Sequence, residues 1–344
     1  MRFLSMLFGL GAEASNDSGR FSYRGPSYHR EAFLKHFDQH LRGLINSYEE
    51  QRQESYRVYK RRSRILAIVF LILLGLSFLL YRRAAFDVPL EIFMLSFAFF
   101  AVAHYYWAAK PVREYTSSIK NIVFPHVLSF YGDQYRFAER PAWQVSSLKA
   151  YDLLPHYDGS DSEDHLVGNY KDVPFQSMEL HLTKKNRNSR GGSSETTVFR
   201  GIAIQIKMQK QFSGKTLVKK DGGFIGNFLG DKFGSLQRVA LEDPVFEKRF
   251  EVYSSDQIEA RYLLSPSFME RLLALIKVFE GSQLECSFFA NSLLILVHSR
   301  KNRFEPSSIY TPVTFSEEIA TVMNELQELF KVIDTLKLDQ HTGL

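Results

Sequence analysis

The chain has 344 residues, of which 45% are hydrophobic and 24% are charged, and these averages describe an ordinary globular protein. The formal net charge of +5 arises within residues 1–64, which hold 12 Lys and Arg against 7 Asp and Glu. A nucleic-acid-binding protein needs a basic field over its folded body, so we expect no nucleic-acid partner. The single cysteine, Cys286, excludes an intrachain disulfide framework and a cysteine metal cluster.

Residues 1–28 predict a flexible N-terminal lead without hydrophobic periodicity. The first 15 residues, MRFLSMLFGLGAEAS, imitate a secretory signal only faintly, because Ser5 and glycines interrupt a short apolar run. We favour a mobile or interface-lying segment. A cleaved signal is the alternative, and it would invert the topology derived below.

Residues 29–131 predict a membrane region with helical extensions on both sides. Apolar residues recur at spacings of three and four in a first amphipathic helix, at Phe33, Phe37, Leu41, Leu44, Ile45 and Tyr48. A second stripe of this kind comes at Val112, Tyr115, Ile119, Ile122 and Val123. We expect the two stripes to pack together as a stalk, with membrane-surface binding or self-association as alternatives.

Two transmembrane helices are predicted at residues 65–81 and 92–109, which contain no Asp, Glu, Lys or Arg. At about 1.5 Å per residue, each covers roughly 26 Å, close to the ~30 Å thickness of the hydrocarbon layer. A buried core helix is the alternative for each. The membrane flanks are predicted at basic and aromatic residues, namely Arg61, Arg62, Arg64 and Trp107.

The charges around the two spans predict their orientation. Residues 57–64 carry five basic residues and no acidic one, whereas the short loop 82–91 balances two arginines with two acids. Because cytoplasmic flanks carry the excess of Lys and Arg, we expect this loop to face away from the cytoplasm and both termini to be cytoplasmic.

Residues 132–338 predict an α+β domain, a mostly antiparallel sheet covered by helices, followed by a tail at 339–344. Alternating apolar and polar residues indicate strands with one solvated face, at 166–170, 175–182, 198–208 and 236–241. A hairpin is expected within 284–298, between a helix at 265–281 and a final helix from about 314 to 336. The segment 184–196 has no apolar residue and is predicted to be a disordered hairpin tip, with lipid-headgroup contact as the alternative.

Three polar features of the sequence are candidates for a catalytic or binding role. The SGKT sequence at 213–216 lacks the first glycine of a phosphate-binding loop, so we do not predict nucleotide hydrolysis. The segment 156–165 is rich in His, Asp and Glu, and a solvated acidic loop is favoured over a metal site. His104 is expected at the membrane interface, with a proton-responsive role as the alternative. We therefore predict no catalytic residue, no cofactor and no metal ligand.

The glycine-rich segment 221–234, DGGFIGNFLGDKFG, predicts an apolar flap. Packing of its phenylalanines over the sheet is the first interpretation. Contact of Phe224 and Phe228 with a partner, a ligand or the bilayer is the functional alternative, because exposed apolar patches usually bind something.

The stretch 239–272 resembles the core of a bacterial family of two-span membrane proteins known as domain of unknown function 3137. The resemblance rests on LEDP at 241–244, Phe246, FxVYSxD at 250–256, ARY at 260–262 and Pro266, with GKTLV at 214–218 and FEPS at 304–307. It extends over roughly residues 30–338. It implies a membrane location and a cytoplasmic domain, and it assigns no enzymatic reaction.

Within this stretch, Arg261 and Tyr262 are candidate contacts for a ligand or partner. An ion pair between Arg261 and Glu259 that fixes the junction of strand and helix is the structural alternative.

These features predict a bacterial inner-membrane protein with two spans, whose cytoplasmic domain is a scaffold or adaptor for a protein partner or a second copy of the chain. A membrane-tethered sensor of lipids or small molecules, using the flap at 221–234, is the alternative function. The sequence favours a non-catalytic role over an enzyme.

Overall fold

A computed structural model describes Tyr23 and residues 29–84, 90–187, 193–209, 211–220, 236–279, 283–299 and 309–338. The chain divides into two compact units, Met1–His126 with Pro306–Ala320, and Val127–Glu305 with Thr321–Leu344. Two of the three boundaries between the units fall inside helices, α5 (Lys110–Ser129) and α10 (Ser316–Leu336).

The first unit is helical. Besides the start of α5 and the first residues of α10, it contains α2 (Arg30–His40), α3 (Leu44–Ala84), α4 (Leu90–Ala103) and the π-helix η2 (His104–Ala108). The continuous helix predicted from His29 into the first span is interrupted once, because α2 ends with the Leu41 amide bonded to the Phe37 carbonyl and a turn precedes α3. Beyond that turn, α3 runs through the polar stretch into the apolar one, as predicted.

Both predicted apolar stripes contribute to the core of this unit. The buried members are Phe33, Phe37, Leu41 and Tyr48 from the first stripe, and Tyr115, Ile119 and Val123 from the second. The Tyr48 hydroxyl donates to the Ser118 carbonyl on α5 at 3.4 Å. Tyr48 also packs edge-on against Phe315, with ring centroids 5.7 Å apart, so a segment close to α10 shares this core.

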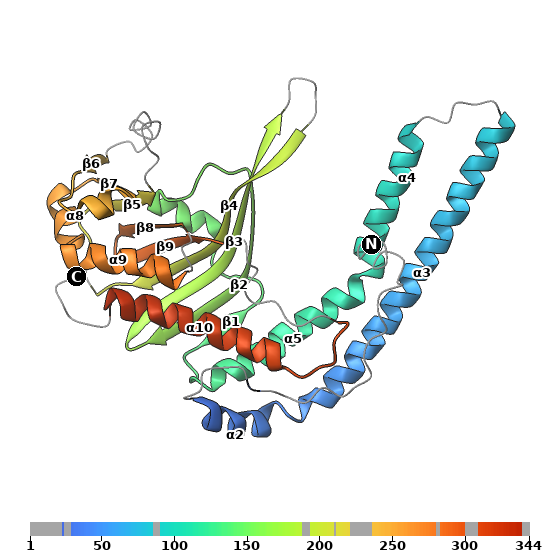
Figure 1. The fold of residues 1–344 in the computed structure, drawn as a ribbon, viewed down its shortest axis with the longest axis horizontal. Coiled ribbons are helices and arrows are strands. Elements are labelled where there is room, and N and C mark those ends of the chain that lie inside the picture. The colour runs from blue at the N-terminus through green and yellow to red at the C-terminus, as the bar shows by residue number, and fades with distance from the viewer. Residues whose placement is uncertain are drawn as a thin grey trace. The chain divides into compact units, whose positions relative to one another are not determined.

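The second unit contains a single nine-stranded antiparallel sheet, which confirms the α+β class (Figure 1). Its spatial order is β1-β2-β3-β4-β9-β8-β5-β7-β6. The strands are β1 (Arg136–Ala138), β2 (Gly159–Tyr170), β3 (Val173–Arg187), β4 (Ser193–Lys207), β5 (Thr216–Lys220), β6 (Gln237–Val239), β7 (Phe250–Ser254), β8 (Leu284–Phe289) and β9 (Ser292–His298). The predicted hairpin is therefore β8–β9, and it turns at Ala290 and Asn291.

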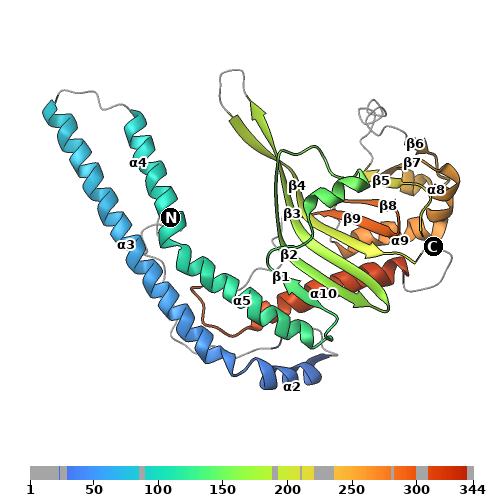
Figure 2. The same ribbon diagram turned by 180° about the vertical axis from the view of Figure 1, so that it is seen from behind.

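Helices cover both faces of this sheet. The 3₁₀ helix η3 (Val145–Tyr151) packs on one face, where its Leu148 joins Leu180 of β3 and Leu296 of β9 in one buried cluster. Helices α9 (Pro266–Val278) and α10 lie over the opposite face (Figures 1 and 2). Two shorter helices, α7 (Pro244–Glu247) and α8 (Gln257–Leu263), flank β7 in the chain.

The prediction that the strands keep one solvated face is wrong for the centre of the sheet. Ala203, on the side of β4 expected to be solvated, is fully buried under the η3 cluster, and Leu293 to Val297 of β9 are all buried. A strand that is covered on both faces carries a continuous apolar run instead of an alternating one, and the LLILV sequence of β9 is such a run.

The prediction of a disordered tip at 184–196 is wrong for residues 184–187 and 193–196, and residues 188–192 lie outside the described residues. The β3–β4 ladder continues through Lys184↔Thr196 to Arg187↔Ser193, so residues of both halves of this segment are paired strand residues. Their polar composition reflects an exposed two-stranded ribbon, whose backbone groups bond to each other and whose side chains face water.

Gly201 permits the close approach of β4 and β9. A Cβ atom at this position would lie 1.9 Å from the Val297 carbonyl oxygen, and the backbone φ of Gly201 is +159°. No side chain fits there, so this glycine is required for the pairing of the two central strands.

Candidate functional sites

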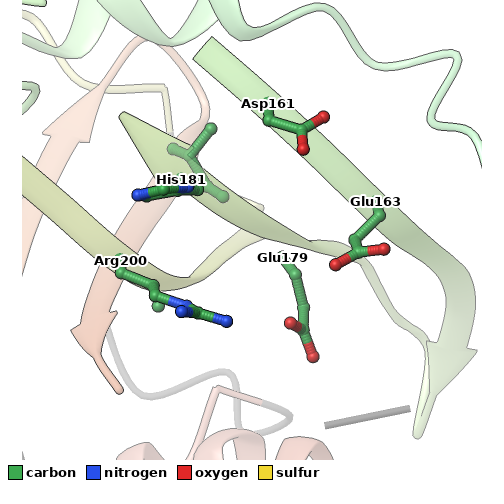
Figure 3. A pocket seen from close by; sticks show the side chains of 7 residues that line it. Asp161, Glu163, Glu179, His181 and Arg200 are labelled. Carbon is green, nitrogen blue, oxygen red and sulfur yellow. The ribbon is translucent and has the colours of Figure 1, made fainter. Parts of the chain in front are cut away.

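A polar pocket lies across β2, β3 and β4, with a volume of about 130 Å³ (Figure 3). The pocket is formed by the pairing of the three strands. Asp161 pairs with His181, and His181 pairs with Arg200 on the far side. Two residues further along, Glu163 pairs with Glu179. The alternation of β3 turns Leu180 and Leu182 into the core and leaves Glu179 and His181 on the other face.

A β-bulge places a further carboxylate, that of Asp164, beside Glu163 and Glu179 of the pocket. The register of β2 shifts between Glu163 and Leu166, and Asp164 adopts a left-handed φ of 56° while its amide donates to the Glu139 carbonyl at 2.9 Å. As a result, carboxylate oxygens of Glu163, Asp164 and Glu179 lie within 4.8 Å of one another.

The pocket combines both signs of charge. The carboxylates are suited to a hard cation or an ammonium group, whereas Arg200, whose guanidinium extends toward the same hollow (Figure 3), is suited to an anion. His181 is fixed by a 2.8 Å hydrogen bond between its Nε2 and the Thr197 hydroxyl. The lining residues include no Ser, Thr or Cys, so within the described residues this pocket offers binding and no side-chain nucleophile of these types.

This arrangement corrects the prediction of a solvated loop at 156–165, because β2 begins at Gly159. Asp161, Glu163 and Asp164 of that segment lie at or beside the pocket, whereas its histidines and Asp158 do not line it. His165 is buried and its Nε2 donates to the Gln176 side chain at 3.1 Å, and burial lowers the pKa of His165. His156 and Asp158 form a separate pair at 3.9 Å. Glu179 also lines the pocket, and the sequence analysis did not name it. The period-two pattern of β3, placed beside that of β2, could have indicated this residue.

Helix α8 carries the predicted contact residues Arg261 and Tyr262. Both are exposed, and Ile258, one turn before Tyr262, is 82% exposed. Residues at i and i+4 lie on one helix face, so these side chains form an exposed surface of mixed character. We call Ile258, Arg261 and Tyr262 the α8 surface.

The ion pair expected between Arg261 and Glu259 is replaced by other partners. In the described part of the chain, Arg261 donates to Gln257 at 3.4 Å. Glu259 accepts from the backbone amides of Ser213 and Gly214 at 2.9 and 2.8 Å. The SGKT loop thus uses two of its amides to bind a carboxylate of the same chain, which agrees with its rejection as a nucleotide site.

The predicted membrane flank brings α3 and η2 together. Arg62 donates to the Trp107 carbonyl at 2.9 Å, and its guanidinium lies 5.3 Å from the centre of the Trp107 ring. Arg61 and Arg64 are exposed on α3. Next to this contact, the Ser63 hydroxyl lies 3.4 Å from Nε2 of His104.

Beyond Arg64, α3 presents an apolar surface that the described residues leave largely uncovered. Its side chains there are largely exposed, including Ile68 at 58%, Ile72 at 62% and Phe78 at 60%. Among the described residues, one helix is long and apolar enough to cross a membrane, and it contains the first predicted span. The second span stays a prediction, because its residues divide between α4 and η2.

Phe224 and Phe228 of the flap lie outside the described residues, so the sensor that depends on them stays a prediction.

Cys286 is fully buried in β8, and burial raises the pKa of its thiol, which keeps it protonated at neutral pH.

Comparison with known proteins identifies part of the chain. Residues 197–338 match a family model described as "Protein of unknown function (DUF3137)". No curated protein matches the chain. Among solved structures, the crystal structure of the mycobacterial trehalose monomycolate transport factor A, TtfA, is similar at 9% sequence identity and a TM-score of 0.32, over 61% of this chain and 93% of that chain. The resemblance inferred from the central sequence block is thus confirmed by the match of residues 197–338 to the DUF3137 family model.

Proposed function

We propose that this protein is anchored in the bacterial inner membrane by a hairpin of two helices, with both termini in the cytoplasm, and that its α+β domain binds a protein partner there. The observation that carries the proposal is the uncovered apolar surface of α3, which follows a cluster of basic residues. In water such a surface would be costly, whereas a lipid bilayer covers it.

The second arm of the hairpin is argued from α4. Its exposed side chains include Leu95 at 68% and Phe99 at 70%. Phe100, in contrast, packs against Phe70 of α3 with ring centroids 4.7 Å apart. Phe100 of α4 therefore packs on α3, and the exposed side chains described on α4 are apolar and can contact lipid.

The partner site is argued from the α8 surface. The α8 surface places the exposed Ile258 beside Arg261 and Tyr262, and Tyr and Arg are enriched where proteins bind proteins. Helix α8 is also held firmly, because the Asp256 carboxylate caps it and Glu259 ties it to the loop before β5.

Membrane anchoring is tested by alkaline carbonate extraction of membranes that contain the full chain. The native chain is expected to stay in the membrane pellet. Asp at both Ile72 and Leu76 should release it, because each charge at the centre of a span costs roughly 2.5–3.5 kcal/mol. Ala at the same two positions is the matched control and should remain in the pellet. Extraction of the native chain would contradict the proposal.

Orientation is tested with a reporter fused after Leu344. The proposal requires activity from a reporter that works only in the cytoplasm and none from one that works only in the periplasm. The reverse pattern would invert the topology and favour a cleaved N-terminal signal.

The partner site is tested by placing a photo-crosslinking amino acid at Ile258 in the full chain in living cells. Val167, an exposed apolar residue of β2, is the matched control position. We expect a specific crosslinked protein from position 258 only, and loss of binding between that purified protein and the Ile258→Asp variant. Equal crosslinking from both positions, or binding unchanged by Ile258→Asp, would contradict this site.

A further inference from the structure

Four arginines and three aromatic residues lie around the point where the apolar surface of α3 begins, in the first unit. The aromatic residues are consecutive in η2 and are 57%, 67% and 42% exposed, at Tyr105, Tyr106 and Trp107. The arginines lie on α3 and α5, at Arg61, Arg62, Arg64 and Arg113. We call these four arginines the arginine collar. Aromatic rings beside basic side chains are typical of a membrane interface, so the collar marks the polar edge of the apolar surface.

Two arginines of the collar are held in place by η2. Pro111 follows η2 in the chain and has no amide hydrogen for the carbonyl groups one turn before it. Arginine side chains donate to carbonyls there, Arg62 to that of Trp107 at 2.9 Å and Arg113 to that of Tyr105. Each guanidinium also lies over the ring of the residue it donates to, 5.3 Å from the ring centre for Arg62 and 4.5 Å for Arg113. These two positive charges are therefore fixed beside the aromatic rings.

The arginines of the collar differ from neighbouring cations in their partners. Arg57 on α3 pairs with Glu54, and Lys110 on α5 pairs with Glu114 at 3.5 Å. Within the described residues, no carboxylate forms an ion pair with any arginine of the collar. The change occurs where α3 becomes apolar. The positive charge of the collar is thus available to an anion from outside the chain.

The chemistry of the collar fits a phosphate group. A guanidinium has five N–H donors in one plane, and Arg62 uses one of them within the described residues. The planar fork of an arginine matches two oxygens of a phosphate. Because the collar adjoins an apolar surface, a partner that combines phosphate with hydrocarbon satisfies both, and a phospholipid is such a partner. A zwitterionic phospholipid balances its phosphate with an ammonium group, so unbalanced positive charge favours an anionic phospholipid.

We propose that the arginine collar binds the phosphate groups of anionic phospholipids and gives the chain a preference for them over zwitterionic ones. This inference rests on the proposed membrane anchoring and adds the class of lipid that the anchor selects. The selection is built into the fold, because η2 positions Arg62 and Arg113 before any lipid arrives and little side-chain entropy is lost on binding.

The chain carries a natural reporter for this test. It has two tryptophans, Trp107 beside the collar and Trp143, which packs against the buried cluster of the second unit. Trp143→Phe leaves Trp107 as the single tryptophan of the full chain. This variant is reconstituted into vesicles of phosphatidylcholine and phosphatidylglycerol, with bromine on the acyl chains of one lipid at a time. Bromine quenches tryptophan fluorescence on contact, so the two quenching curves give the relative binding of the two lipids beside Trp107.

The expected result is a preference for phosphatidylglycerol of at least about threefold, since each basic side chain near an anionic surface favours binding by up to about fivefold. The preference should shrink at high salt, which screens these charges. Arg62→Gln and Arg113→Gln should each lower it by about two- to fivefold. Arg61→Gln combined with Arg64→Gln should also lower it, and this variant keeps the contact between Arg62 and Trp107 intact.

Arg57→Gln is the matched control, because it removes an arginine of α3 that already has a carboxylate partner. It should leave the preference unchanged. Equal quenching by the two lipids, or a preference that falls as much with Arg57→Gln as with the collar variants, would overturn this inference and leave membrane anchoring intact. Absence of quenching by either lipid would contradict the anchoring itself, and the inference would fail with it.

Discussion

Arg52 is a charged side chain with no solvent exposure, and its partners explain how the chain tolerates it. Its Nε and Nη2 donate to the two carboxylate oxygens of Glu49 at 2.9 and 2.6 Å, and its Nη1 donates to the Ile309 carbonyl at 2.7 Å. Glu49 also accepts from the Val313 amide at 2.9 Å. This pair therefore fastens the segment before α10 to α3.

Replacing Arg52 should destabilise the protein considerably. In Arg52→Met, the Ile309 carbonyl and the Glu49 carboxylate lose buried partners, and we expect a loss of about 2–3 kcal/mol in the free energy of unfolding. Denaturant unfolding of the full chain in detergent measures it. Arg57→Ala is the control and should leave the stability unchanged, because Arg57 is an exposed arginine of the same helix that pairs with the exposed Glu54.

His165 should make stability depend on pH. Burial lowers the pKa of His165 in the folded state below the ordinary value of 6.5, and the hydrogen bond with Gln176 offsets this in part. As the pH falls, the unfolded chain therefore takes up a proton on His165 at a higher pH than the folded chain does. The stabilisation is complete above pH 6.5 and is lost as the pH falls from 6.5 to the lowered pKa of the folded state. The thermal midpoint should drop between pH 7.5 and 5.5, and His165→Gln should reduce that drop. His156→Gln, at an exposed position, should not.

At the scale of elements, α8 depends on a single side-chain cap. One carboxylate oxygen of Asp256 accepts from the amides of Ile258 and Glu259 at 2.9 and 3.0 Å. Asp256→Ala should cost about 1 kcal/mol and reduce partner binding through fraying of α8, whereas Asp256→Asn should preserve both. Hydrogen exchange at the α8 amides measures the fraying. Equal exchange in the Ala and Asn variants would show that the cap is not what holds this helix.

Long elements with strong periodicity were predictable from the sequence, and short or doubly covered ones were not. Helix α9 begins at Pro266 and α10 at Ser316, close to their predicted starts, because proline and the first acidic residues of α10 favour helix N-termini. The five-residue β5 was missed, since two apolar residues between polar ones give no clear period.

The residues of the candidate sites were also predictable only where the local sequence marks them. Arg261 and Tyr262 could be named in advance because they stand in a recognisable local sequence. The carboxylate group of Glu163, Asp164 and Glu179 could not, because it depends on the register of β2 against β3 and on a bulge that turns Asp164. Register is set by the whole pattern of buried side chains and is not visible in one strand.

At the scale of the whole molecule, the apolar hairpin is separable from the rest of the fold. Removing residues 65–109 keeps the Arg52–Glu49 pair and its hold on residues 309–313. Because Arg62 contacts Trp107, the two cut ends lie close together and a short Gly-Ser linker can join them. We expect this variant to be soluble without detergent and to unfold cooperatively, as measured by circular dichroism. Its aggregation, or a transition without cooperativity, would show that the hairpin is needed for folding.

The solitary thiol of Cys286 has a practical consequence for work in intact cells. It lies within β8 at the centre of the sheet, and the sequence holds no other cysteine. A membrane-permeant maleimide can modify the protein only when the sheet opens. The rate of alkylation therefore measures that opening directly. The native chain can thus report its own unfolding in intact cells, with no engineered label.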